Sequence, residues 1–207
     1  MSTTSSDPTV AVVDGLEARG WACLDAFLAA DEARELAAEC LGAREAGAFR
    51  RARVGRGSGK VIREDIRRDE VLWLEEATAG PAARRYLDRL EELRLGINRR
   101  FFAGLFNFEG HFAVYPPGAF YKAHLDRHRG TADRVVTAIL YLNDGWVPED
   151  GGRLKLWTTP GVQEGPVEWI EPRLGTLVVF FAGDHWHEVE VAQRTRASVT
   201  GWFRVRG

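Results

Sequence analysis

The sequence has 207 residues, of which 45% are hydrophobic and 28% are charged, a composition typical of one soluble globular domain. The net charge of −2 excludes the strongly basic character expected of a general nucleic-acid-binding or membrane-surface protein. Two cysteines are too few for a disulfide framework, and no apolar run approaches the length of a membrane span.

The N-terminal part of the chain is predicted to be mainly helical. Residues 1–9 are polar and lack the apolar core of a secretory signal, which indicates a disordered tail and a cytoplasmic protein. A short helix or turn is expected at 13–16 and a strand at 21–24. Residues 31–46 repeat apolar side chains at helical spacing, with Cys40 as a buried free thiol on that stripe.

Residues 50–63 carry six basic side chains and no acidic one, with glycine at every second position from 55 to 59. Glycine at this density indicates a mobile loop. The segment is either a solvated hairpin tip or a lid that contacts an acidic partner or closes over a substrate. Because it has no interleaved aromatic residues, a nucleic-acid contact is disfavoured.

A short strand or turn is expected at 66–74, followed by a second long helix at 81–100. Pro81 suits the first turn of that helix. The apolar stripe of the helix consists of Tyr86, Leu90, Leu93 and Ile97. The aromatic run at 101–108 predicts a bend that leads into a sheet.

From residue 111 onward, short β-like runs alternate with turn signals rich in glycine, proline, asparagine and aspartate. The expected strands are 111–115, 119–126, 134–142, 153–157, 167–170, 176–181, 187–191 and 198–205. Without helices long enough for parallel crossovers, they predict a double-stranded β-helix, a cupin-like jelly roll. The expected fold is mainly β (α+β) and forms a single domain over 10–207. Its helical part, 10–110, would pack on one sheet of the jelly-roll core at 111–207.

The second of these strands carries a pair of side chains that indicates a metal site. Residues two apart on a strand point to the same side, so His124 and Asp126 would present an imidazole and a carboxylate to one point. They are two parts of the 2-His-1-carboxylate set of non-haem Fe(II) oxygenases. The third part can come from His185 or His187, which share a face if extended, so geometry alone leaves both open.

A basic residue beyond these histidines supplies a second criterion. A 2-oxo diacid that binds iron through one end needs its far carboxylate held by a planar, permanently charged group, which arginine provides. Arg196 follows in the next strand, and a short hairpin would bring it back towards His187. Arg194, two residues earlier, could share that orientation.

Several motifs place this pattern in a family. They are Val114-Tyr115-Pro116, Tyr121-x-x-His124-x-Asp126, the run Arg134 to Asn143, Gly151-Gly152-x-Leu154, the run Gly175 to Phe181, His187-Glu188-Val189 and Arg196-x-x-x-Thr200-x-Trp202-Phe203. Through them the region 111–205 resembles the 2-oxoglutarate/Fe(II)-dependent dioxygenase superfamily. More narrowly, it is similar to the prolyl 4-hydroxylases of the oxygen-sensor type and their bacterial relatives. Upstream, the run Ile66 to Asp69 followed by Trp73 matches a segment of that same narrow group.

The resemblance implies roles for individual residues. The iron ligands and catalytic centre would be His124, Asp126 and His187, and Arg196 would pair with the distal carboxylate of 2-oxoglutarate. Further cosubstrate contacts are implied for Tyr115, Tyr141, Leu154 and Thr200. The wall around the target proline would include Tyr121, Arg134, Trp202, Arg67 and Asp69, with Asp69 paired to Arg134. The loop at 50–63 would be a finger over the substrate, and His128 would be a bystander.

The implied activity is peptidyl-proline 4-hydroxylation with Fe(II), O2 and 2-oxoglutarate, which releases succinate and CO2. Ascorbate is a further candidate cofactor. The implied partner is a cytoplasmic protein substrate, with translation elongation factor Tu as the family-level candidate, and the enzyme is expected to be a monomer. One alternative is a 2-oxoglutarate oxygenase that acts on a small molecule or on alkylated nucleic acid. Another is a non-enzymatic, cupin-like metal-binding sensor.

Overall fold

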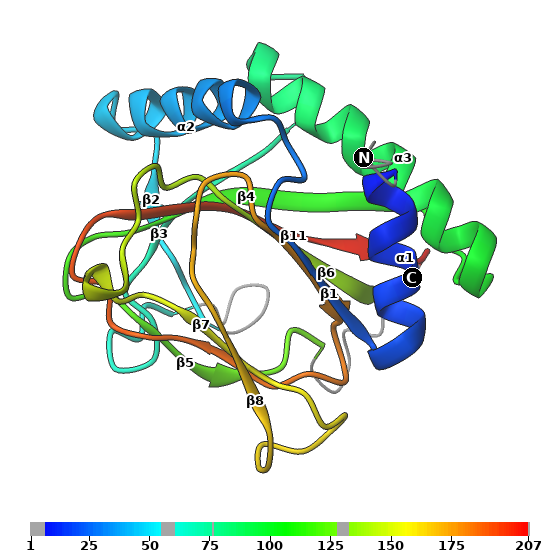
Figure 1. Cartoon of the computed structure of the whole chain (residues 1–207). Coiled ribbons are helices and arrows are strands. Elements are labelled where there is room, and N and C mark those ends of the chain that lie inside the picture. Colours follow the sequence, from blue (N-terminus) through cyan, green and yellow to red (C-terminus); the bar gives the residue numbers. More distant parts are fainter. Residues whose placement is uncertain (1–6, 55–60, 76, 128–132, 207) are drawn as a thin grey trace, which may run out of the picture.

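The computed structural model describes residues 7–54, 61–75, 77–127 and 133–206. Two antiparallel sheets face each other, and three helices cover the outer face of the larger sheet (Figure 1). The larger sheet has the strand order β1-β9-β6-β11-β4-β3-β2, and the smaller one has the order β5-β10-β7-β8. The predicted jelly roll is confirmed.

The strands reproduce the predicted pattern. The larger sheet contains β1 (Trp21–Leu24), β2 (Arg50–Arg51), β3 (Glu70–Trp73), β4 (Asn107–Tyr115), β6 (Arg134–Tyr141), β9 (Leu177–Phe181) and β11 (Arg196–Arg204). The smaller sheet contains β5 (Tyr121–His124), β7 (Leu154–Trp157), β8 (Val167–Ile170) and β10 (His187–Val189). A short 3-10 turn, η2 (Pro148–Asp150), precedes β7. Each of the eight runs predicted after residue 110 overlaps an observed strand.

The predicted division between a helical part at 10–110 and a sheet from 111 does not coincide with a structural boundary. Strands β1, β2 and β3 come from the N-terminal part and join the larger sheet, and β4 already starts at Asn107. β1 pairs with β9, more than 150 residues later in the sequence, with Trp21 opposite Phe180. Pairing over such a separation is not encoded in local periodicity.

Helix α1 (Pro8–Arg19) starts earlier than expected. The side chain of Asp7 accepts a hydrogen bond from the Thr9 amide at 2.9 Å, and Pro8 occupies the first turn, so the helix includes the last two residues of the predicted tail. Gly20 ends the helix with φ of 79°, a left-handed conformation that glycine adopts readily. Residues 1–6 lie outside the described residues.

Helices α2 (Ala30–Glu45) and α3 (Pro81–Phe101) match their predictions within a residue, and the predicted stripe of α3 is buried. The start of α3 is capped from outside, because the carboxylate of Glu39 on α2 accepts from the amides of Gly80 and Ala82 at 3.1 and 3.0 Å. The predicted bend follows at Phe102, whose φ is 49°. Cys40 is a buried free thiol, as predicted.

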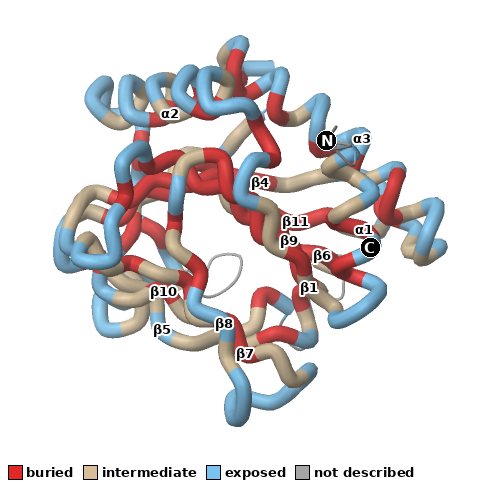
Figure 2. The backbone as a smooth tube through the Cα atoms, in the orientation of Figure 1, coloured by how far each residue is buried: buried red, intermediate tan, exposed pale blue. Residues whose placement is uncertain are grey.

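The strands of the larger sheet alternate between two hydrophobic clusters. On β11, Ala197, Val199 and Phe203 pack towards the helices, whereas the alternate positions face the smaller sheet. Figure 2 shows the buried segments concentrated along β4, β6, β9 and β11. Polar side chains at these inward positions lie between the sheets, where a functional site can form.

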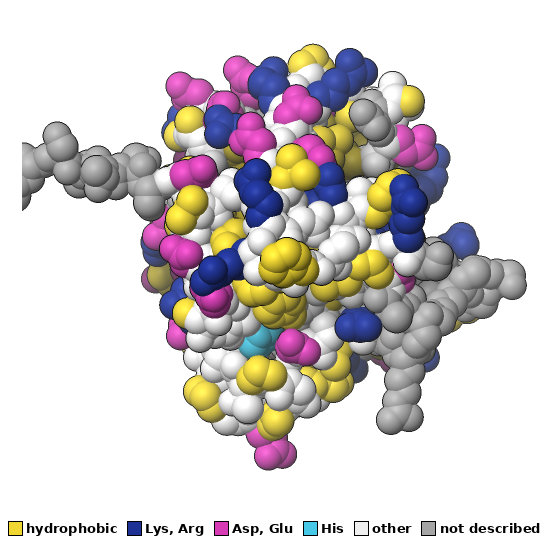
Figure 3. All heavy atoms as spheres, turned by 90° about the vertical axis from the view of Figure 1, so that its right-hand side faces the viewer, with side chains coloured by type: hydrophobic (Ala, Val, Ile, Leu, Met, Phe, Trp, Pro, Cys, Tyr) yellow, Lys and Arg dark blue, Asp and Glu magenta, His cyan; other side chains and the backbone are white. Residues whose placement is uncertain are grey.

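The surface is mixed in charge. On the face shown in Figure 3, acidic and basic side chains are interspersed with hydrophobic ones, in keeping with the net charge of −2. The flanks of the predicted loop at 50–63 form an antiparallel hairpin, in which Val54 and Val61 pair. Residues 55–60 lie outside the described residues, so the predicted mobility stays a prediction. Within the described ranges, no helix is both long enough and apolar enough to cross a membrane.

Candidate active site

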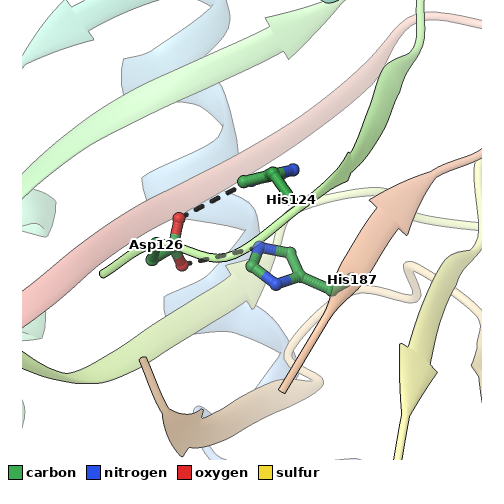
Figure 4. Close-up of side chains that lie close together, drawn as sticks. All are labelled: His124, Asp126 and His187. Carbon is green, nitrogen blue, oxygen red and sulfur yellow. Dashed lines mark ion pairs between the residues drawn. The ribbon is translucent and has the colours of Figure 1, made fainter. Parts of the chain in front are cut away.

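Three side chains converge between the sheets (Figure 4). His124 ends β5, His187 begins β10, and Asp126 lies in the bend just after β5. One ligand atom from each of these residues lies within 4.8 Å of the others. The Asp126 carboxylate is 3.6 Å from Nε2 of His124 and 3.5 Å from Nε2 of His187. This is the donor set that the sequence predicted for Fe(II).

The strand pairing explains part of this convergence and corrects another part. β5 and β10 are antiparallel, with His187 directly opposite His124. The predicted strand at 119–126 ends at His124, so Asp126 does not share a strand face with it. After β5 the backbone turns, and the amide of Arg127 donates to the carbonyl of Ala182 at 3.0 Å. The bend, rather than strand alternation, turns Asp126 towards the histidines.

The orientation of the two imidazoles suits a divalent metal. Nδ1 of His124 lies 2.8 Å from the Lys122 carbonyl, and Nδ1 of His187 lies 3.1 Å from the His185 carbonyl. Each Nδ1 therefore donates to a backbone carbonyl, which leaves Nε2 as the atom that would bind a metal. Burial, followed by the neighbouring His124, lowers the pKa of His187 to about 4. Two imidazoles whose Nε2 atoms converge on one carboxylate are a donor set that fits Fe(II).

The carboxylate itself stays ionised. Burial would raise the pKa of Asp126, but His187, His124 and a hydrogen bond from Thr137 outweigh it and hold that pKa well below its usual range. Oγ1 of Thr137 donates to Oδ2 of Asp126 at 2.8 Å. The Asp126 carboxylate is therefore ionised at physiological pH and available to bind a cation.

The structure distinguishes the two candidate histidines. His185 lies outside the triad, and its Nδ1 donates to the Trp157 carbonyl at 2.9 Å. Its Nε2 points towards Gly20, where an added Cβ would lie only 2.8 Å away. His185 is thus a buried packing residue, whereas His187 faces the other two ligands.

The two candidate arginines also differ. Arg196 is 1% exposed, and its Nε donates to the Gly152 carbonyl at 2.8 Å. Gly152 has φ of 62°, and a Cβ there would lie 3.0 Å from Cδ of Arg196, so glycine suits this position. Arg194 is partly exposed and pairs with Asp150 at 3.0 Å.

Arg196 carries a buried charge that lacks a counter-ion, because no carboxylate of the described residues pairs with it. An unpaired buried charge is costly, so the position calls for an anion. Its Cζ lies 4.9 and 5.0 Å from the ring centres of Tyr115 and Tyr141, and the hydroxyl of Tyr141 is buried without a partner. A carboxylate of 2-oxoglutarate fits this combination of one guanidinium and two phenols.

A cavity of about 90 Å³ joins the triad to Arg196. Of the predicted site residues, its wall includes Arg67, Tyr115, Tyr121, His124, Asp126, Arg134, His187, Arg196, Thr200 and Trp202. Tyr141 lies beside Arg196, behind this wall, and Leu154 is fully buried between the sheets. The individual cosubstrate and substrate roles of these residues stay predictions.

The comparisons with known proteins agree with this geometry. The model of the 2OG-Fe(II) oxygenase superfamily matches residues 110–204. A solved prolyl-4-hydroxylase from Pseudomonas putida is 45% identical, with a TM-score of 0.85 over 96% of this chain and 100% of that one. The chain belongs to the 2-oxoglutarate/Fe(II)-dependent oxygenase superfamily, in its prolyl hydroxylase group. It is thus a dioxygenase that uses Fe(II) and 2-oxoglutarate.

The oxygenase has more distant relatives of the same group. A Trichoplax adhaerens prolyl hydroxylase, solved with a peptide fragment of the hypoxia-inducible factor oxygen degradation domain, is 27% identical, with a TM-score of 0.84 over 95% of this chain and 88% of that one. The hypoxia-inducible factor prolyl hydroxylase of Caenorhabditis elegans and human Egl nine homolog 1 are 28% and 27% identical over 93% of this chain. The chain spans only 27% and 45% of the length of these two relatives.

One predicted contact of the oxygenase is wrong. Asp69 does not pair with Arg134 but with Arg67, through two hydrogen bonds of 2.7 and 2.5 Å, and it does not line the cavity. Arg134 instead pairs with Glu109 at 2.7 Å and lies over the Trp202 ring, with Cζ 3.4 Å from the ring centre. The antiparallel bridge between Arg67 and Tyr121 places Arg67 at the edge of β5, and the ion pair holds Asp69 to Arg67.

The Arg67–Asp69 pair supports an iron ligand. Cζ of Arg67 lies 4.2 Å from the Tyr121 ring centre, and the Tyr121 ring stacks on His124 at 3.7 Å with an 18° interplanar angle. Burial would lower the pKa of Arg67, but the bonds to Asp69 raise it, so the guanidinium stays charged. Tyr121 therefore orients His124, and its predicted place in the substrate wall stays a prediction.

Two further residues of the oxygenase site escaped the sequence prediction: His111, which lines the cavity, and Thr137, which does not. His111 is buried, and Thr137 bonds to Asp126 from the neighbouring sheet. Side chains two apart on a strand share a face, so counting back from Tyr115 through Ala113 would have placed His111 on the cavity face.

Proposed function

We propose that the protein is a prolyl 4-hydroxylase that adds a hydroxyl group to C4 of a proline in a polypeptide, with succinate and CO2 as co-products. Its family membership and the prolyl hydroxylases named among its relatives support this reaction. Bound Fe(II) would couple oxidative decarboxylation of 2-oxoglutarate to activation of O2. The protein's own residues position the two substrates and exclude water.

The observation that carries the proposal is the connection between two cavities of different size. The small cavity at the triad shares Arg67, His111, Arg134 and Trp202 with an outer groove of about 810 Å³. The small cavity suits a compact ring, whereas the outer groove has room for the residues on either side of a proline. The groove thus supports a substrate that extends beyond the reacting ring, as a polypeptide does on either side of a proline.

The roles of the chain's residues follow from this arrangement. Arg196 would hold the distal carboxylate of 2-oxoglutarate, with Tyr115 and Tyr141 beside it. Trp202, backed by the charge of Arg134, would face the proline ring. The predicted loop at 50–63 borders the outer groove through Arg50, Arg51, Arg53 and Ile62, a location that suits a finger over a bound polypeptide.

The substrate is proposed to be a cytoplasmic protein, with elongation factor Tu as the first candidate and a monomeric enzyme as the working form. The support is the sequence resemblance to bacterial members of the group together with the 45% identity to the Pseudomonas putida enzyme.

The test is a panel of proline-containing peptides, with intact elongation factor Tu, incubated with Fe(II), 2-oxoglutarate and O2. Mass spectrometry should find the gain of one oxygen on proline, with one succinate per hydroxylation. Turnover restricted to free metabolites or alkylated bases would refute the proline assignment. Absence of succinate with every substrate would favour a binding protein instead.

A further inference from the structure

His111 occupies the neck between the inner cavity and the outer groove, and both are lined by it. It lies on β4, opposite Trp73 of β3 on one side and Thr200 of β11 on the other. Its ring centre is 4.9 Å from that of Trp73 and 5.6 Å from that of Trp202. A substrate that reaches from the groove to the triad has to pass these three rings.

The imidazole of His111 has unused hydrogen-bonding capacity. Nδ1 is buried and makes no hydrogen bond, and no residue in the described ranges bonds to Nε2. Nε2 is not among the enclosed, unpartnered atoms of the described residues, and His111 lines both cavities, so this nitrogen is the one that faces them. Burial, followed by the charge of Arg67, lowers the pKa of His111 to about 3, and the ring is neutral. A neutral imidazole has one N–H donor and one lone pair.

The position of the proton follows from the cost of burial. A buried N–H without a partner is rarer in proteins than a buried acceptor without one. The enclosed Nδ1 is therefore the nitrogen with the lone pair, and Nε2 carries the hydrogen. His111 thus presents a single N–H donor to the neck.

We propose that His111 is a substrate-positioning residue, whose Nε2–H donates a hydrogen bond to a backbone carbonyl of the polypeptide beside the target proline. This assignment rests on the proposed prolyl hydroxylase function. The bond before a proline offers a carbonyl but no N–H, because proline nitrogen carries no hydrogen. Arg67 and Arg134, which line the same neck, favour the negative oxygen end of a carbonyl dipole there.

The experiment compares His111→Phe, which keeps an aromatic ring but lacks the donor, with His111→Gln, which restores an N–H. The probe is the proline peptide that the wild-type protein hydroxylates fastest in a panel with randomised flanking residues. For His111→Phe we expect the KM for this peptide to rise roughly three- to tenfold, the loss of one hydrogen bond. Its kcat should change little, and His111→Gln should recover most of the affinity.

Two further readouts separate positioning from packing. In His111→Phe, succinate formed without hydroxyproline should increase, and 2-oxoglutarate binding to the iron-loaded protein should stay unchanged. The melting temperature of His111→Phe should be equal or higher, because a buried nitrogen without a partner is removed. His185→Phe is the matched control: it breaks the bond to the Trp157 carbonyl, so it should lower the melting temperature and leave the peptide KM unchanged.

The outcomes are distinct. An unchanged peptide KM in His111→Phe, with an active wild-type protein, overturns the positioning role alone. An equal rise of the peptide KM in His111→Phe and His111→Gln, together with a lower melting temperature, also overturns the positioning role. That result would indicate that His111 acts by packing. A wild-type protein that hydroxylates no proline peptide refutes the proposed function and this inference with it.

Discussion

The hydroxyl of Thr137 donates to Oδ2 of Asp126 at 2.8 Å and thereby ties an iron ligand of the bend after β5 to the middle of β6. Oδ1 of Asp126 lies 3.6 Å from Nε2 of His124 and Oδ2 lies 3.5 Å from Nε2 of His187, so this bond fixes the rotation of the carboxylate between the two histidines. Outer hydrogen bonds of this kind orient a ligand and tune the metal.

Replacing Thr137 by valine should therefore weaken metal binding while preserving the fold. We expect the affinity for Fe(II), or for Mn(II) as a stable substitute, to fall roughly 10- to 100-fold. Anaerobic metal titration measures it, and Thr137→Ser, which keeps the hydroxyl, is the matched control. Equal affinity in the valine and serine variants would mean that the hydroxyl does not orient Asp126.

The two histidines near β10 should respond differently to truncation. His187→Ala removes an Nε2 that faces Asp126, so the variant should lose metal binding and all turnover. His185→Ala removes a packing residue, so it should keep the metal and lose only stability. Metal content after dialysis and thermal unfolding measure the two effects. Retained metal in His187→Ala would show that the ligand assignment is wrong.

The buried charge of Arg196 predicts a specific cosubstrate defect. Arg196→Ala removes a charged hydrogen-bond donor worth about 1.5–3 kcal/mol, so the 2-oxoglutarate requirement should rise roughly 10- to 100-fold. Arg194→Ala, at a partly exposed ion pair, should leave that requirement unchanged. Initial succinate rates against 2-oxoglutarate concentration distinguish them. The reverse pattern would move the cosubstrate anchor to Arg194.

Stability of the metal-free protein should fall in mild acid. The folded-state pKa values of His187 and His111 are about 4 and about 3, whereas an unfolded histidine titrates near pH 6.5. Below pH 6.5 the unfolded chain binds protons that the folded chain does not, so stability decreases as pH falls towards 4 and then 3. Each histidine can contribute on the order of 3 kcal/mol to this loss.

Urea unfolding of the metal-free protein at about pH 7.0, 5.5 and 4.5, which covers this window, measures how the free energy of unfolding changes with pH. His111→Phe removes one of the two buried imidazoles, so its stability should depend less steeply on pH. Stability that is constant across the series would show that neither imidazole resists protonation in the folded state.

The cap that α2 provides for α3 predicts a local stability effect. Glu39→Ala leaves the amides of Gly80 and Ala82 without their carboxylate partner, which should cost about 1–2 kcal/mol in the free energy of unfolding. Glu45→Gln, at an exposed position of the same helix, is the control and should be neutral. Equal unfolding midpoints for the two variants would show that Glu39 does not stabilise the start of α3.

Much of the fold was predictable because local signals suffice for it. The helical stripe ending at Ile97 and the turn residues between the strands mark each element in the sequence itself. His187 could not be separated from His185 by spacing, since the choice depends on where β10 begins. The partners of Asp69 and Arg134 depend on the register between segments far apart in sequence, and local periodicity carries no such register.

The site is divided between the two sheets: both histidine ligands belong to the smaller sheet, whereas Arg196, the proposed anchor of 2-oxoglutarate, belongs to the larger one. The span from metal to anchor is therefore set by the side chains packed between the sheets, such as Leu156 and Phe180. A chain that kept its strands but loosened this packing would lose 2-oxoglutarate before it lost iron. The affinity for 2-oxoglutarate therefore reports on the packing between the two sheets.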